Sequence, residues 1–468
     1  MTLLDFYKTF SIALKLQHMK NLSYFLILEV LMLMTSCTNS DVVSNKLNAS
    51  EKNCYYVSIS GNDSNVGTVD APFATLSKAQ SLVQPGDTLY IRGGVYKVAE
   101  NQVMENDSNS IWDYVFNMNK SGTIDKNIYY SGYKNERPVF DLSAVKPENK
   151  RVIVFYVSGS YLHFKNIEVT GTQVTILTHT QSECFHNEGG NNNIYENLSM
   201  HDGMAIGFYL TKGMNNLILN CDAYNNYDPV SEGGAGGNVD GFGCHPNSAG
   251  STGNVFRGCR AWYNSDDGFD LINSYAATTF DHCWSFLNGY KTDGSLAADG
   301  NGFKAGGYGM TAGTKIPSVI PSHTVRFCLA YGNKSNGFYS NHHLNGDTWL
   351  NNTAYKNSTN FNMVNRKSAT EIVDVDGYNH VLTNNLSFSP KKTGEDIINI
   401  NLSKCTVNNN TFLPNQMTVT SDDFVGLDAS QLTRSRKTDG SLPDIDFMVL
   451  KENNILYKAS IGYSVTDK

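Results

Sequence analysis

A repeated six-residue pattern limits the folds open to this chain more than any other feature. It has a cysteine first, a small residue third, an aromatic residue fourth and an asparagine sixth, and it starts at Cys221, Cys259, Cys283 and Cys328. Weaker copies have asparagine in the first position and start at Asn166, Asn197, Asn352, Asn385 and Asn409. Four intervals are 24 residues long (197 to 221, 259 to 283, 328 to 352 and 385 to 409), and the others are longer. Short apolar segments at this spacing, with Gly and Asn turns, are typical of the coils of a parallel β-helix.

Stacked coils place equivalent residues one strand spacing apart, at about 4.8 Å. The repeated cysteines should therefore form an inward column of small apolar residues, as free cysteines often do. The asparagines that close the pattern should form a ladder at a turn, at Asn226, Asn264, Asn288 and Asn333. Connections between parallel strands are almost always right-handed. We therefore predict an all-β fold, a right-handed parallel β-helix.

The N-terminal part of this domain predicts a cap for the open end of the coil stack. Strands are expected at 55–58 and 88–92, with a short amphipathic helix near 73–83 between them. Such a capping helix would cover strand edges that otherwise stay exposed. No linker or composition break follows, so we predict a single domain over residues 54–468.

The first 37 residues read as a targeting segment. A basic start at Met19-Lys20 precedes a mostly apolar run from Leu22 to Met34, which is short for a membrane span but fits a signal peptide. Small residues before Cys37 resemble a bacterial lipobox, so we predict lipidation of Cys37, with Met19 as the true start and 38–53 as a polar tether. A secreted or cell-envelope lipoprotein, held at the outer membrane and monomeric, is the expectation.

Charge and cysteine content narrow the function classes. The chain has 36 Lys and Arg against 44 Asp and Glu, a net charge of -8, with no basic cluster. A nucleic-acid partner is therefore not expected. The cysteines after Cys37 show no Cys-x-x-Cys spacing and suggest neither a zinc site nor a disulfide framework.

A second motif, Asp or Asn followed by Gly-Phe and a variable residue, accompanies four successive coils. Its first positions predict one column, formed by Asp240, Asp267, Asn301 and Asn336. Its variable positions predict the next column, formed by Gly243, Asp270, Lys304 and Tyr339. Consecutive coils would thus bring several carboxylates and one lysine to the same face.

Close carboxylates need a cation. Two of them about 5 Å apart repel by roughly 3 kcal/mol at an effective dielectric near 20. Calcium takes six to eight oxygen ligands, so we predict a Ca²⁺ site at Asp240, Asp266, Asp267 and Asp270. A partly desolvated lysine near a cation loses proton affinity, so Lys304 is predicted to act as a general base. The alternatives are a solvated acidic turn and a solvated or carboxylate-binding lysine.

Two insertions point to the same columns. The coils that start at Cys221 and Cys283 carry extra loops around 229–238 and 289–299, which should wall a groove. Candidate substrate-binding residues near it are Arg260, Lys291, Lys334, Tyr339 and His342. Ordinary surface charges and a solvated turn are the alternative reading of these five.

The Asp-Gly-Phe, Asp-Asp-Gly-Phe-Asp and Asn-Gly-Phe-Lys series resembles polysaccharide lyase family 9, the pectate lyase L-like group. The resemblance extends from Tyr55 to about Gly462. It implies calcium ligands at the same four aspartates, Lys304 as the base, and β-elimination on an acidic plant cell-wall polysaccharide. The expected substrate is polygalacturonate or rhamnogalacturonan I. A β-helix glycoside hydrolase of pectin, using Asp266 and Asp267, and a non-catalytic glycan-binding surface protein are the alternatives.

Overall fold

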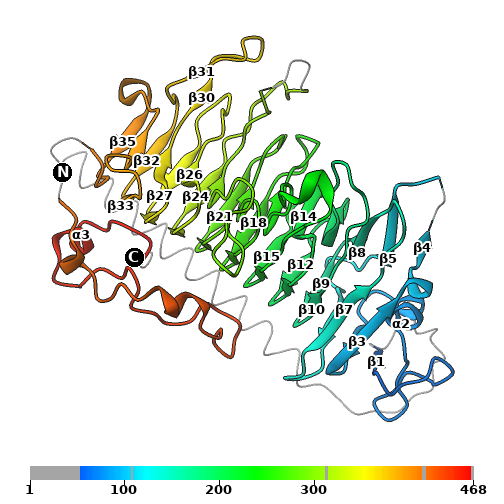
Figure 1. Ribbon diagram of the computed structural model, residues 1–468. Helices are drawn as coiled ribbons and strands as arrows, with labels where there is room; N and C mark the ends of the chain where they lie inside the picture. Colours follow the sequence, from blue (N-terminus) through cyan, green and yellow to red (C-terminus); the bar gives the residue numbers. More distant parts are fainter. Residues whose placement is uncertain (1–52, 107–108, 311–314, 414–417, 465–468) are drawn as a thin grey trace, which may run out of the picture. The chain divides into compact units, whose positions relative to one another are not determined.

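The computed structural model describes residues 53–106, 109–310, 315–413 and 418–464 (Figure 1). Residues 52–468 form one compact unit. Within the described ranges, no helix is long and apolar enough to cross a membrane. The predicted signal peptide, Met19 and Cys37 lie outside the described residues, so export and lipidation stay predictions.

Three long sheets build the described part of the chain, and each complete coil contributes one strand to each sheet. Sheet A has twelve parallel strands in the order β1 (Cys54–Val57), β2 (Thr88–Ile91), β6 (Ile128–Gly132), β9 (Leu162–Lys165), β12 (Ile194–Glu196), β15 (Leu217–Leu219), β18 (Asn254–Arg257), β21 (Thr278–Asp281), β24 (Thr324–Arg326), β27 (Thr348–Leu350), β32 (Val381–Thr383) and β35 (Thr406–Asn408). Sheet B has ten, in the order β3 (Gly94–Ala99), β7 (Pro138–Ala144), β10 (Glu168–Thr170), β13 (Ser199–His201), β16 (Asp222–Tyr224), β19 (Arg260–Trp262), β22 (Trp284–Phe286), β25 (Leu329–Tyr331), β28 (Thr353–Tyr355) and β33 (Leu386–Phe388).

Sheet C carries the Asp-Gly-Phe motif. Over the described residues its eleven strands are β4 (Glu105–Asn106), β5 (Trp112–Met118), β8 (Arg151–Val157), β11 (Glu183–Glu188), β14 (Ile206–Lys212), β17 (Phe242–Cys244), β20 (Phe269–Asp270), β23 (Phe303–Lys304), β26 (Asn336–Tyr339), β29 (Thr359–Asn362) and β34 (Ile397–Ile398). Strand β4 is antiparallel to β5, and the other pairs are parallel. A short antiparallel hairpin, β30 (Asn365–Arg366) and β31 (Asp374–Val375), projects from the C-terminal coils (Figure 1).

The parallel β-helix predicted from the repeat is confirmed. Each repeated pattern supplies a strand of sheet B, and its cysteine points inward with no exposed surface, at Cys221, Cys259, Cys283 and Cys328. Three of the weaker copies are off by one residue. Sheet B pairs Glu168 with Ser199 and Ser199 with Asp222, so Ile167 and Leu198, rather than Asn166 and Asn197, align with Cys221. The repeat predicts Asn409 in the last copy, but Asn410 occupies the ladder, because its side-chain oxygen accepts from the Asn385 backbone at 2.8 Å.

The core of the stack is built from aromatic ladders. The four phenylalanines of the Gly-Phe motif and Phe361 of the next coil stack along sheet C with ring centroids 4.8–5.1 Å apart, at Phe242, Phe269, Phe303, Phe338 and Phe361. Since side chains alternate along a strand, an inward phenylalanine turns the next residue outward. This alternation presents the variable residues of the motif on the outer face.

A short helix covers the N-terminal end, as predicted. Helix α2 (Leu76–Leu82) begins where the Thr75 hydroxyl accepts from the Lys78 amide, and it buries Leu76 and Ala79 in the core (Figure 1). Short 3₁₀ turns elsewhere are η1 (Glu100–Gln102), η2 (Ser231–Gly234) and η3 (Leu402–Lys404).

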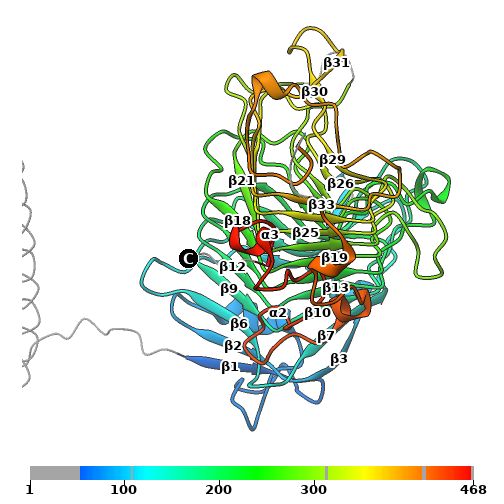
Figure 2. The same ribbon diagram turned by 90° about the vertical axis from the view of Figure 1, so that its left-hand side faces the viewer.

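The C-terminal segment, described from 418 to 464, lies along the outside of sheet B (Figure 2). It contains η4 (Ser421–Asp423), η5 (Ala429–Thr433) and helix α3 (Ile455–Lys458). Its apolar side chains, Phe424, Leu432, Phe447, Leu450 and Leu456 among them, form a second cluster with the outward aromatic residues of sheet B, including Trp262, Trp284 and Phe286. The outer face of sheet B is therefore covered from β16 to β33.

Candidate active site

The outer face of sheet C carries the two predicted columns. Register pairs join Gly243 to Asp270, Asp270 to Lys304 and Lys304 to Tyr339, so the variable residues of the motif do form one row. The first positions form the adjacent row through backbone-to-side-chain hydrogen bonds. The Asp267 amide donates to Asp240 Oδ1 at 3.0 Å, and the Asn301 amide donates to Asp267 Oδ1 at 2.6 Å. Both column predictions are borne out in the geometry.

The three aspartates Asp240, Asp266 and Asp267 each direct one carboxylate oxygen toward a common point. These oxygens lie within 4.8 Å of one another. Asp240 is 3% exposed and Asp267 is fully buried, so their charges are poorly solvated. Carboxylates packed this closely are a donor set suited to a hard cation.

The ends of the two long insertions hold Asp266. Its Oδ2 accepts from the Asn238 amide at 2.8 Å, and its Oδ1 accepts from the Asp299 amide at 3.2 Å. Lys334 also holds the second insertion in place. Its Nζ donates to the Ala297 carbonyl at 2.9 Å and to the Ala298 carbonyl. Both insertions thus reach the acidic cluster.

Lys304 sits over the aspartates. Its Nζ lies 3.1 Å from an oxygen of Asp267 and 3.1 Å from an oxygen of Asp270, and its side chain is 12% exposed. Burial alone would lower the pKa of Lys304, but the charges of Asp270, Asp267, Asp266 and Asp240 outweigh burial and raise it well above its usual value. Lys304 is the cation in both of these ion pairs with the acidic cluster.

The pKa values of the aspartates are raised as well, which for a carboxyl group disfavours the charged form. Burial, reinforced by the charges of the neighbouring carboxylates, raises the pKa of Asp240 well above its usual range. Burial and the charge of Asp267 raise the pKa of Asp266 to about 8. Burial also raises the pKa of Asp267, although Lys304 opposes it. The single ammonium of Lys304 therefore does not neutralise the negative charge of the buried aspartates.

Comparison with known proteins now decides the family. Residues 55–379 match the family described as the Pel9A-like right-handed β-helix region. The chain belongs to this family. Pectate lyase L of Dickeya dadantii (strain 3937) is 33% identical over 456 residues, which cover 94% of each chain. A solved structure titled rhamnogalacturonan lyase is 52% identical, with a TM-score of 0.83 over 88% of this chain and 99% of the other.

The crystal structure of pectate lyase Pel9A is 33% identical, with a TM-score of 0.68 over 88% of this chain and 92% of that one. The predicted membership of polysaccharide lyase family 9 is confirmed, and so is the enzyme class, a polysaccharide lyase. In this Pel9A-like protein the acidic cluster and Lys304 come from the matched region.

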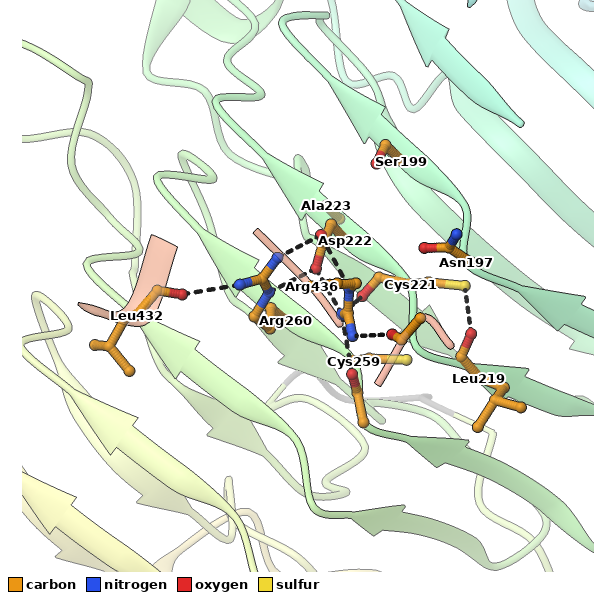
Figure 3. Close-up of polar contacts among 12 residues, drawn as sticks. Asn197, Ser199, Leu219, Cys221, Asp222, Ala223, Cys259, Arg260, Leu432 and Arg436 are labelled. Atoms are coloured by element: carbon orange, nitrogen blue, oxygen red, sulfur yellow. Dashed lines mark hydrogen bonds and ion pairs between the residues drawn. The ribbon is translucent and has the colours of Figure 1, made fainter. Parts of the chain in front are cut away.

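Arg260 does not reach this Pel9A-like site, and its prediction as a substrate-binding residue is corrected. It lies on sheet B, is 3% exposed, and pairs with Asp222 at 2.7 Å (Figure 3). Its other nitrogen donates to the backbone carbonyls of Leu432 and Arg434 at 3.0 and 2.9 Å. Arg260 therefore anchors the C-terminal segment, because sheet B is the covered face.

The other two basic candidates, Lys291 and Lys334, also contact groups outside the acidic cluster. The Lys291 Nζ lies 4.1 Å from the ring centroid of Tyr227, and both line a cleft with Asp202 and Tyr263 that contains none of the five predicted catalytic and metal residues. The ammonium of Lys334 is used by the insertion backbone, as described above. The structure does not place either ammonium at the acidic cluster.

Tyr339, by contrast, lies beside Lys304, and His342 contacts Tyr339. Tyr339 is the register partner of Lys304 on the next coil. Its hydroxyl is 2.9 Å from His342 Nε2, and His342 Nδ1 is 2.6 Å from Asp374 Oδ1. No motif in the sequence predicts Asp374, which contacts His342 from the hairpin strand β31.

His245 is a second residue that the motif did not assign. Its Nε2 lies 3.8 Å from Asp270 Oδ2, and its Nδ1 lies 3.0 Å from the Tyr209 hydroxyl. The period of two along a strand could have found it, since Gly243 and His245 share the outer face.

A buried group outside this site, His323, His343 and Asp347, brings three further potential metal ligands together. The backbone amides of Thr278 and Gly307 donate to the Nδ1 atoms of His323 and His343 at 3.2 and 3.0 Å. Each neutral ring then carries its proton on Nε2, which cannot bind a metal. The group fits a structural hydrogen-bond ladder, since the His323 amide in turn donates to Asp347.

Proposed function

We propose that this protein is a calcium-dependent lyase that cleaves galacturonate-containing pectin backbones by β-elimination, with Lys304 as the base. One observation carries the proposal. The Lys304 amine lies 3.1 Å from both Asp267 and Asp270, at the outer face of a buried acidic cluster. A hydrolase that works with a pair of carboxylates has no role for this amine.

The donor set fits calcium. Asp240, Asp266 and Asp267 offer oxygens within 4.8 Å of one another, whereas Asp270, the fourth predicted ligand, lies outside that group and pairs with Lys304. Cys244 is near in sequence but is fully buried, so the set contains oxygen ligands and no thiolate. Bound calcium would supply electrostatic stabilisation for the uronate carboxylate and for negative charge developing next to it.

Lys304 would remove the proton from C5 of the galacturonate. The neutral amine is the reactive form. The aspartates raise the pKa of Lys304 because their charges are uncompensated, so a cation bound at the same carboxylates removes that effect. The electron pair of the C5–H bond then forms the C4–C5 double bond, and the C4–O4 bond breaks.

The substrate is the finer part of the proposal. Relatives are named pectate lyase L, and the solved structure at 52% identity is titled rhamnogalacturonan lyase. Polygalacturonate and rhamnogalacturonan I both place galacturonate at the cleaved bond, so both fit the site. The higher identity to the second makes rhamnogalacturonan I the first substrate to test.

The test follows ultraviolet absorbance of the unsaturated product from each polymer, with calcium or with excess chelator. We expect calcium-dependent absorbance that Lys304→Ala lowers by about 10²–10⁴-fold, the usual contribution of a general base. Lys97→Ala, an exposed lysine on sheet B, is the matched control and should keep full activity. New reducing ends without the absorbance would mean hydrolysis and would overturn the proposal.

Export and lipidation are a separate proposal for the first 37 residues. The lipobox-like sequence before Cys37 is its support. Labelled palmitate should enter the expressed protein and should be lost in Cys37→Ser. Labelling that survives this substitution would overturn the assignment.

A further inference from the structure

β-Elimination has a second requirement that Lys304 does not meet. When the C4–O4 bond breaks, O4 leaves as the oxygen of a sugar, and an unprotonated sugar alkoxide is a poor leaving group. A positioned acid that protonates it contributes typically 10²–10⁴-fold. C5 and O4 are two bonds apart, so this acid must lie close to the base.

Tyr339 occupies the position next to Lys304 in the outward row. The two residues are register partners on neighbouring coils, whose strands lie about 4.8 Å apart. The Tyr339 ring is half-buried on the same outer face. The next tyrosine of the row in the other direction, Tyr209, is three coils from Lys304, or about 14 Å.

A histidine and a carboxylate back the Tyr339 hydroxyl. His342 Nε2 lies 2.9 Å from the hydroxyl, and His342 Nδ1 lies 2.6 Å from Asp374 Oδ1. The carboxylate fixes the orientation of the imidazole ring. Asp374 is 53% exposed and His342 is 22% exposed, so the far end of this chain of groups reaches solvent.

The local backbone is shaped to build this contact. Asn341 and His342 have φ values of 53° and 55°, two successive residues in the left-handed region. Left-handed conformations of non-glycine residues cost free energy and concentrate at functional sites. Here they turn the His342 ring back to the hydroxyl three residues earlier. The β30–β31 hairpin then carries Asp374 to the other side of the ring.

We propose that Tyr339 is the general acid that protonates the leaving O4, and that His342 and Asp374 resupply its proton. This inference rests on the proposed β-elimination. Tyr339 would contact the reacting oxygen and is the catalytic residue, whereas His342 and Asp374 act through it as positioning residues. If Tyr339 only bound the sugar, it would not need His342 and Asp374 hydrogen-bonded in series behind its hydroxyl.

The proton and electron balance is complete with the groups present. The neutral Lys304 amine takes the C5 proton and becomes an ammonium, and the C5–H electron pair becomes the C4–C5 π bond. The C4–O4 pair leaves with O4, which takes the Tyr339 proton. The imidazolium of His342 gives its Nε2 proton to the tyrosine oxygen. Solvent then removes a proton from Lys304 and returns one to His342.

The test compares two leaving groups. One substrate is the natural polymer, and the other is an oligosaccharide with a 4-deoxy-4-fluoro-galacturonate at the cleaved position, assayed by fluoride release. Fluoride leaves without being protonated, so Tyr339→Phe should lower polymer cleavage by about 10²–10⁴-fold and leave fluoride release unchanged. Fluoride release by the same preparation also shows that the variant is folded.

Controls separate the possible outcomes. Lys304→Ala should lose both activities, since both need C5 proton removal. Tyr156→Phe removes a tyrosine hydroxyl five coils from Lys304 on the same row and should change neither. His342→Gln and Asp374→Asn should lower kcat on the polymer with little change in KM or in fluoride release.

Equal losses on both substrates in Tyr339→Phe would overturn this inference while leaving the proposed lyase intact, because the hydroxyl would then only position the sugar. Unchanged polymer cleavage would overturn it as well. A wild-type protein that cleaves neither substrate would overturn the proposed function, and the inference with it.

Discussion

At the scale of single residues, the charge of Asp240 has opposite effects on stability without and with a bound cation. It is 3% exposed, and burial and three neighbouring aspartates raise its pKa well above the usual range. Without a cation its charge destabilises the folded protein, and with a cation the same charge binds. Functional sites commonly accept such a cost.

We therefore expect Asp240→Asn to change metal-free and calcium-bound stability in opposite directions. The asparagine keeps the oxygen that accepts from the Asp267 amide but removes one buried charge. The metal-free variant should unfold at a higher temperature than the wild type. Its calcium affinity should fall about tenfold or more, or about 1.4 kcal/mol.

Calorimetric calcium titration and thermal unfolding in chelator measure these two effects. Exposed Asp125→Asn is the control and should change neither. A variant less stable than wild type in chelator, with unchanged calcium affinity, would show that Asp240 has a structural role alone.

At the scale of elements, asparagine ladders fix the stacking of the coils. Asn288 shows the pattern, because its Oδ1 accepts from the Asn264 amide at 3.1 Å while its own amide donates to Asn333 at 3.0 Å. Its side-chain nitrogen also donates to the Ala261 carbonyl at 3.1 Å. Each side chain thus replaces a backbone partner that the turn leaves without one.

Asn288→Ala should lower the free energy of unfolding by about 3 kcal/mol, since it leaves several fully buried polar groups unpaired. Chemical denaturation measures the change. Asn101→Ala, on an exposed 3₁₀ turn, should stay within about 0.5 kcal/mol of wild type. A loss at Asn288 as small as at Asn101 would contradict a stabilising ladder.

At the scale of the whole molecule, the C-terminal segment is held against sheet B by a buried charge cluster. Asp222, 7% exposed, pairs with Arg260 at 2.7 Å and with Arg436 at 2.6 Å (Figure 3). Burial opposes the charge of Asp222, but Arg436 and Arg260 outweigh it and lower its pKa to about 2. This pairing joins the middle coils to a segment more than 200 residues later.

Asp222→Asn should destabilise the protein by about 3–5 kcal/mol, because it leaves two buried arginines without their carboxylate. Hydrogen exchange should rise first in 421–463. Asp444→Asn breaks an exposed pair with Lys437 in the same segment and should cost less than about 1 kcal/mol. Uniform exchange across all coils would contradict the anchoring role.

The same pairing predicts an acid limit. A carboxyl whose folded pKa is lowered from 3.8 to about 2 adds stability that is complete above pH 3.8 and is lost as pH falls toward 2. The stability difference between wild type and Asp222→Asn should therefore shrink over that window, which denaturation at several pH values measures.

The sequence by itself determined the coil, the two columns and the five residues of the acidic cluster and its lysine. Successive coils of a solenoid bring equivalent positions of a repeated motif together, so the motif predicts neighbours in space even where insertions make the spacing along the chain unequal. Lys304 beside Asp270, and Asp267 beside Asp240, follow from their positions in the Gly-Phe motif.

Only the tertiary structure decided the contacts made by irregular segments. Asp374 beside His342 depends on the path of a hairpin, and Arg260 under Leu432 depends on which sheet the C-terminal segment covers. The amides that hold Asp266 depend on where two insertions end. No period relates these pairs, because loops follow side-chain packing and hydrogen bonding rather than a repeated register.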